Sequence, residues 1–214
     1  MRLDVEEIKK SPELPKIIQE FTRLLEEEEK KRQEFYKTIT EEVKAEFING
    51  EIIFHSPAKN KHLIAVGNLF MALSFYVLKN DLGIVHSEKA LVSLTRNDYE
   101  PDIAFWSKEK ASKFQPDQMR FPAPDFIVEV LSENTEECDR GIKFEDYALH
   151  DVREYWIVDP ETGFVEQYQL QGDKYDLLRR IDTGEIESIV IPGFRLPVKS
   201  IFDREANMEF MRKL

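Results

Sequence analysis

The sequence is short of cysteine, of basic residues relative to acids, and of long hydrophobic runs. Cys138 is the only cysteine among 214 residues, so no internal disulfide can form, as is usual in a reducing cytosol. The N-terminal stretch has no apolar segment that would mark it for export, and we expect a cytoplasmic protein. The longest apolar stretch, residues 63–78, is shorter than the roughly 20 residues that span a bilayer, so it predicts a buried core helix.

The charge balance narrows the class of function. The chain carries 42 acidic and 30 basic residues, for a formal net charge of -12. Such a protein repels a polyanion at long range, which argues against a histone-like or repressor-like binder of nucleic acid. Acidity does not exclude an enzyme that meets phosphates through bound divalent cations, because clustered carboxylates are what such a site requires.

The N-terminal region predicts an amphipathic helix. Apolar residues follow helical spacing from Leu14, with Ser11 as N-cap and Pro12 at the first helical position. The helix continues into residues 26–34, a block without an apolar face that is either a solvated extension or an arm joining a partner chain. We therefore expect a helical extension over residues 1–38 and one α/β domain over residues 39–214.

The hydrophobic pattern of residues 39–214 predicts strands and helices in alternation. Asn49-Gly50, between two short alternating runs, predicts a tight hairpin. The remaining patterns predict helices over residues 59–79 and 136–150, strands over 84–94, 102–106, 126–131 and 154–159, and a C-terminal β-meander. A strand, a helix and a strand in that order imply a right-handed crossover between parallel strands.

The stretch FIVEVL, residues 126–131, places a glutamate inside an otherwise apolar strand. Side chains alternate along a strand, so Glu129 shares a face with Ile127 and Leu131 and projects into the dry interior. An ionised carboxylate left unpaired there costs several kcal/mol. Glu129 therefore needs either a basic partner or a divalent cation held together with a second acid.

Asp102, at the start of the preceding predicted strand, is the expected second acid. Mg²⁺ binds one or two carboxylates and leaves its other positions to water and substrate phosphate. Lys143, on the following helix, is the candidate for a lysine that orients the attacking water and stabilises charge on the phosphoryl group, and Asp139 and Tyr147 share its helical face. A structural ion pair of Glu129 with Lys143 or Arg140 uses the same residue types, and spacing alone does not separate the two interpretations.

Four ordered blocks of the sequence resemble the Uma-two family, whose members are grouped with restriction endonucleases in the PD-(D/E)XK nuclease superfamily. The blocks are residues 46–73, 100–106, 124–160 and 189–202, and the resemblance runs from about Thr40 to Asp203. It implies a restriction-endonuclease-like αβββαβ core with a mixed sheet flanked by helices. The N-terminal helical extension and the C-terminal β-meander would be added to this core.

The resemblance also implies a site and an activity. Asp102 and Glu129 match the metal-binding acids of the superfamily. The lysine expected two residues later is Leu131, and relatives with this gap supply a lysine from the next helix, here Lys143. Acids that recur in the family match Glu46 and Glu51, and a histidine that opens the first core helix matches His62; these residues would complete the metal site or orient its waters.

We expect a Mg²⁺-dependent DNA endonuclease, with Mn²⁺ as a substitute and a homodimer as the working unit, because such nucleases often cut two strands with two subunits. The alternative is a nuclease-fold module that has lost catalysis and acts in protein interaction or nucleic-acid binding. Leu131 and the acidic charge favour this alternative.

Overall fold

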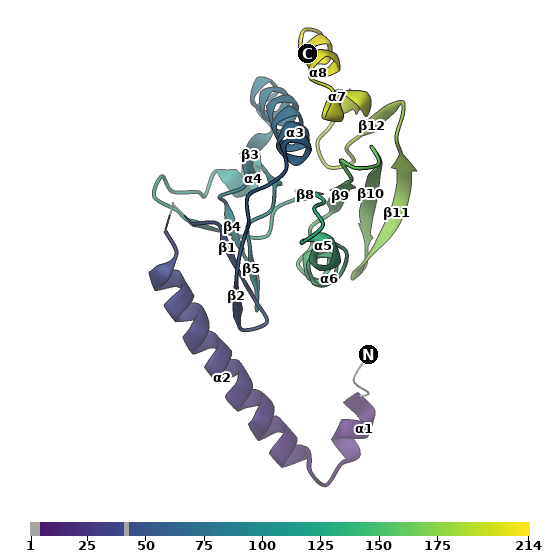
Figure 1. Cartoon of the computed structure of the whole chain (residues 1–214). Coiled ribbons are helices and arrows are strands. Elements are labelled where there is room, and N and C mark those ends of the chain that lie inside the picture. The colour runs from purple at the N-terminus through teal and green to yellow at the C-terminus, as the bar shows by residue number, and fades with distance from the viewer. Residues whose placement is uncertain (1–4, 41–42) are drawn as a thin grey trace.

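The computed structural model describes residues 5–40 and 43–214. Its centre is a six-stranded mixed sheet with the order β11-β10-β9-β8-β6-β3 and helices on both faces (Figure 1). The strands are β3 (Gly83–Ser87), β6 (Ile103–Ser107), β8 (Phe126–Val130), β9 (Glu154–Val158), β10 (Val165–Gln171) and β11 (Lys174–Ile181).

The helices that cover this sheet give the order of the predicted nuclease core. Helix α3 (Asn60–Lys79) lies on one face, and α5 (Glu136–Arg140) with α6 (Ile142–Leu149) lies on the other (Figure 1). Strands β8 and β9 are parallel across this crossover, whereas β3, β6 and β8 are antiparallel neighbours. The chain therefore follows αβββαβ, which confirms the predicted fold. The single helix predicted over residues 136–150 is wrong in one respect, because it breaks at Gly141.

A second sheet has five short strands in the order β2-β1-β5-β4-β7. They are β1 (Ala45–Ile48), β2 (Glu51–Phe54), β4 (Leu91–Ser93), β5 (Asp98–Tyr99) and β7 (Arg120–Phe121). Strands β1 and β2 form the predicted hairpin, and both turn residues have the positive φ that a tight turn needs, 51° at Asn49 and 83° at Gly50. The strand predicted over residues 84–94 is wrong, because the chain leaves the first sheet at Glu88 (φ 59°) and enters the second.

Alternation along β8 divides the hydrophobic core into two layers. Phe126, Val128 and Val130 pack with α3, whereas Ile127 and Leu131 pack on the α6 side. Helix α3 is long and apolar enough to cross a membrane by length and composition, and within the described residues no other helix is. In the fold its inner face is the centre of the first layer, as predicted for a core helix.

The N-terminal helix α2 (Leu14–Thr38) follows a short helix α1 (Val5–Lys10) and runs out beyond the body (Figure 1). Its predicted start at Pro12 is wrong, because the N-cap is Glu13. The C-terminal half docks through buried Phe35 and through Arg32, whose Nε lies 2.6 Å from Asp98 Oδ2. The predicted solvated extension therefore makes a buried ion pair.

The remaining elements were not all predicted. The polar loop between β6 and β8 contains α4 (Lys108–Ala111) as well as β7. After the β10-β11 hairpin the chain forms β12 (Glu185–Glu187) and β13 (Arg195–Pro197), and it ends in helices α7 (Lys199–Phe202) and α8 (Arg204–Met211) rather than in strands.

Candidate metal-nuclease site

Lys143 lies at the centre of a buried group of carboxylates on the α6 side of the sheet. Its Nζ is 3.0 Å from Glu46 Oε1, 3.1 Å from Glu129 Oε1 and 3.1 Å from Asp139 Oδ1. The lysine side chain is 3% exposed. The contact with Glu129 is a hydrogen bond, and the contacts with Glu46 and Asp139 are close ion pairs, so three carboxylates surround one ammonium group.

Four separate elements bring this group together. Glu129 projects from the middle of β8 and Glu46 from β1 of the second sheet. Lys143 and Asp139 lie one helical turn apart on either side of the break at Gly141. One turn further along α6, the hydroxyl of Tyr147 donates a hydrogen bond of 2.9 Å to Glu129 Oε1.

Asp102 lies beside Glu129 on the neighbouring strand. The backbone N–H of Val130 donates to Asp102 Oδ2 at 2.8 Å, and the backbone N–H of Asp102 donates to Glu129 Oε2 at 3.2 Å. Both carboxylates are almost wholly buried. Each is thus fixed by the backbone of the strand that carries the other, and the two acids predicted from sequence meet in space.

The outer side of Asp102 faces two further basic groups. Lys44 Nζ lies 3.4 Å and His62 Nε2 lies 3.5 Å from Asp102 Oδ1. His62, in the first turn of α3, therefore joins the site as the resemblance implied, and its Nδ1 is buried without a hydrogen-bond partner among the described groups. Lys44 was not singled out from sequence, although strand alternation puts it on the same side as Glu46 two residues later.

Two other residues of the β1-β2 region differ in their relation to the site. His55 Nε2 lies 3.2 Å from Glu46 Oε2, a contact that sequence reasoning missed. Glu51 lies at the start of β2, directly after the hairpin turn, and its side chain is exposed. Its placement gives no support to the prediction that it completes the metal site.

The carboxylates of the cluster have very different pKa values. Burial raises the pKa of Glu129 to about 8, and the nearby charges of Asp139, Asp102 and Glu46 add to this shift against the opposing effect of Lys143. Burial acts on Glu46 in the same direction, but Lys143 and His55 outweigh it and lower its pKa to about 2. Crowded carboxylates that share too few cations behave in this way.

Asp102 and His62 stabilise each other's charged forms. Burial raises the pKa of Asp102, but His62, Lys44 and the Val130 N–H outweigh it and bring that pKa to about 2. Burial lowers the pKa of His62, and Asp102 reverses the shift so that the pKa is raised. Near neutral pH, Asp102 is therefore ionised while Glu129 retains part of its proton.

The donor set suits a hard divalent cation. No group of three or more His, Cys, Asp or Glu side chains with metal-binding geometry occurs in the described part of the chain. Mg²⁺ does not require one, since two carboxylates with water and phosphate oxygens satisfy it. Four carboxylates meet here, those of Asp102, Glu129, Glu46 and Asp139. They face two lysines, Lys143 and Lys44, and two histidines, His55 and His62.

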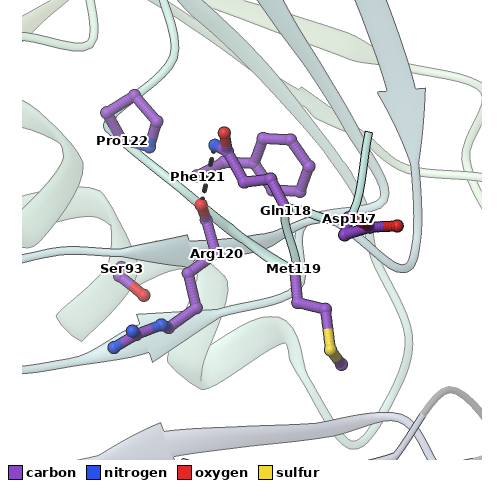
Figure 2. Close-up of a pocket in the computed structure, with 7 residues that line it drawn as sticks. All are labelled: Ser93, Asp117, Gln118, Met119, Arg120, Phe121 and Pro122. Atoms are coloured by element: carbon purple, nitrogen blue, oxygen red, sulfur yellow. Dashed lines mark hydrogen bonds between the residues drawn. The ribbon is translucent and has the colours of Figure 1, made fainter. Parts of the chain in front are cut away.

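A hollow of about 530 Å³ is lined in part by Val43, Lys89 and Glu100; Val43 precedes Lys44 in the chain, and Glu100 precedes the Pro101-Asp102 pair. Another, of about 540 Å³, lies over the loop that leads into β7 (Figure 2). There Gln118 donates a hydrogen bond to the carbonyl of Arg120, and none of the predicted site residues lines the wall. None of the predicted site residues lines the first hollow either, but two of its lining residues, Val43 and Glu100, lie close in the chain to Lys44 and Asp102.

Comparison with known proteins agrees with this geometry. A family model named Uma2 and described as "Putative restriction endonuclease" matches residues 27–199, most of the chain. The chain belongs to the Uma2 family. The match begins inside α2, so the half of that helix that docks on the body lies within the family region.

The fold has a solved counterpart. It is similar to the crystal structure of a protein from Anabaena variabilis that is described as a "putative nuclease belonging to DUF820", with a TM-score of 0.68 and 19% identity over 79% of this chain and 96% of the other. At that identity the likeness shows the fold alone. A search of curated proteins gives no match. Membership in Uma2 and the nuclease fold confirm the resemblance read from sequence.

Proposed function

We propose that this Uma2 protein is a divalent-metal-dependent endonuclease that hydrolyses DNA phosphodiester bonds. The observation that supports the proposal is the meeting of Asp102 and Glu129 on adjacent strands, with a lysine bonded to one of them. Two acids from distant parts of the chain that converge in a buried position have a large desolvation cost. A bound cation and a phosphate substrate would offset that cost.

In this proposal Asp102 and Glu129 hold Mg²⁺, or Mn²⁺ in its place. The cation would polarise a phosphoryl oxygen and lower the pKa of an attacking water. Lys143 keeps Glu129 oriented, because its ammonium and the Tyr147 hydroxyl both bond Glu129 Oε1. Among the described residues, the other oxygen of Glu129 has no side-chain donor and accepts a hydrogen bond from the Asp102 N–H alone.

Incubation with DNA tests the activity. Purified protein is mixed with supercoiled plasmid and with linear duplex in Mg²⁺, Mn²⁺ or EDTA, and products are resolved on gels. We expect metal-dependent cleavage that Asp102→Asn abolishes, whereas Glu205→Gln, an exposed acid on α8, leaves it unchanged. Cleavage that persists undiminished in Asp102→Asn would assign the activity to another site or to a contaminant.

A second candidate function is a nuclease-fold module without catalysis. Leu131 at the position of the motif lysine and the full set of carboxylate partners around Lys143 favour it. Calorimetry with Mn²⁺ separates the two candidates, because a competent site binds the ion and is stabilised by it. An inactive module shows no binding that depends on Asp102.

We further propose that the chain works in the cytoplasm as a homodimer. Helix α2 exposes Ile18, Phe21 and Leu25 on the face that continues from its docked half, so part of an otherwise buried stripe remains available for another subunit. Light scattering after size exclusion measures the mass. A mass of 25.2 kDa for the full-length protein would contradict the dimer.

A further inference from the structure

We propose that Lys44 is the lysine that contacts the substrate phosphate, and that Lys143 is a positioning residue that holds the carboxylates. This inference rests on the proposed nuclease function and names the cation that the sequence motif leaves unassigned. It follows from the surroundings of the two lysines: Lys143 is buried among three carboxylates, whereas Lys44 is partly exposed and has one ion pair among the described residues.

Lys143 is poorly suited to contact a phosphate. Its ammonium lies 3.0 to 3.1 Å from carboxylate oxygens of Glu46, Glu129 and Asp139, and its side chain is 3% exposed. To reach a substrate oxygen it would have to release a carboxylate that has no other ammonium near it. Its contacts instead orient Glu129 towards Asp102, which is a structural task within the site.

Lys44 has the opposite surroundings. Its side chain is 22% exposed, and its one direct ion pair among the described residues, with Asp102 Oδ1, is long at 3.4 Å. The backbone is anchored, because the carbonyl of Lys44 accepts a hydrogen bond from the N–H of His55 at 3.2 Å. A fixed backbone with a flexible four-carbon side chain lets the ammonium move without disturbing the sheet.

The position of Lys44 also places it where a substrate can approach. Val43 and Glu100, which line the hollow of about 530 Å³, are next to Lys44 and next to the Pro101-Asp102 pair in the chain. The Lys44 ammonium itself lies 3.4 Å from Asp102 Oδ1. Lys44 and His62 both contact this oxygen, so a phosphate that reaches Asp102 comes close to both basic groups.

Asp102 has other partners when Lys44 moves away. His62 Nε2 lies 3.5 Å from Oδ1, and the N–H of Val130 donates to Oδ2, so the buried carboxylate is not left without partners. Lysine binds phosphate as a point charge and offers three donors. Moving from a carboxylate to a phosphate oxygen, it neutralises substrate charge in an otherwise acidic protein without the transfer of a proton or the formation of a bond.

The test compares Lys44→Met, Lys44→Arg and a control, Lys174→Met, at the far edge strand β11 of the sheet. Binding of a short fluorescein-labelled DNA duplex is measured by anisotropy over a salt series in Ca²⁺, which takes the same oxygen ligands as Mg²⁺. Losing one phosphate contact lowers the slope of log affinity against log salt by about 0.9. We expect this loss in Lys44→Met, its recovery in Lys44→Arg, and no change in Lys174→Met.

Cleavage in Mg²⁺ gives the second readout. We expect kcat/KM of Lys44→Met to fall by about 100-fold, the usual effect of removing one donor to the transition state. If the wild type cleaves DNA and Lys44→Met changes neither the salt slope nor the cleavage rate, the role of Lys44 is wrong and the nuclease function stands. If the wild type does not cleave DNA but Lys44→Met still lowers the salt slope of binding, the nuclease function is wrong and the phosphate contact of Lys44 stands. Wild type that binds no duplex overturns both.

Discussion

Replacing Lys143 with methionine tests the buried cluster most directly. Methionine keeps most of the length and the apolar stem of lysine but removes the ammonium that lies 3.0 to 3.1 Å from Glu46, Glu129 and Asp139. Three carboxylates are then left in a buried space without their central cation. Breaking a buried ion pair by removing one partner costs about 3–5 kcal/mol, because an uncompensated charge remains.

The loss of stability in Lys143→Met should appear as a lower Tm and should depend on pH. In a chain of this length each kcal/mol lowers Tm by about 2–4 °C, so a fall of about 10 °C is expected. Protonation relieves the repulsion, and the pKa of Glu129 is already raised to about 8 by burial and by its acidic neighbours. The loss should therefore be smaller at pH 6 than at pH 8, since more of the carboxyl is neutral at the lower pH.

Urea unfolding followed by the fluorescence of buried Trp106 and Trp156 measures the free energy. Lys59→Met is the control, because the Lys59–Glu133 ion pair is exposed and its loss should leave the urea midpoint close to that of the wild type. Adding Glu129→Gln to Lys143→Met should recover about 1 kcal/mol or more by removing one of the unpaired charges. If Lys143→Met unfolds at the wild-type urea midpoint with the same m-value, the ammonium does not hold these carboxylates in solution.

Three further outcomes are expected. The folded-state pKa of Glu129 is raised from 4.5 to about 8, so between these pH values the folded state binds more protons than the unfolded state. The free energy of unfolding therefore falls as pH rises through this range. Equilibrium unfolding of Glu129→Gln should show a weaker dependence of that free energy on pH. Arg32→Met leaves Asp98 buried without its cation, which should cost about 3 kcal/mol and speed hydrogen exchange in the C-terminal half of α2; unchanged exchange would mean that apolar packing alone docks the helix. Gly50→Ala should lower Tm more than Gly172→Ala, since both have positive φ but only at Gly50 would a Cβ lie 2.8 Å from a side-chain carbon of α2; equal shifts would contradict that close approach.

Patterns that depend on near neighbours in the chain predicted much of this fold. The hairpin at Asn49-Gly50 follows from two residues that accept positive φ, and the buried face of Glu129 follows from strand alternation. The order of strands and helices was enough to predict that β8 and β9 are parallel. These features need no knowledge of distant contacts.

Other boundaries were set by packing that local patterns do not encode. The helix predicted over residues 136–150 is interrupted at Gly141, where a Cβ would lie 2.7 Å from the carbonyl oxygen of Glu137. The run over residues 84–94 has strand composition throughout, yet the chain changes sheets at Glu88. Hydrophobic alternation specifies a strand but does not specify which sheet it joins.

The sequence by itself determined that an acid is buried in β8 and that Asp102 and Lys143 are suitable partners for it. Only the tertiary structure decided which charges are paired. Glu46 and Asp139 form ion pairs with Lys143, whereas Lys44 and His62 contact Asp102. Glu51 lies apart from the cluster. The physical reason is that charge interactions depend on separation in space and on burial, and β1 reaches the cluster from a different sheet. Spacing along the chain fixes the face on which a side chain lies, and the fold fixes what it meets there.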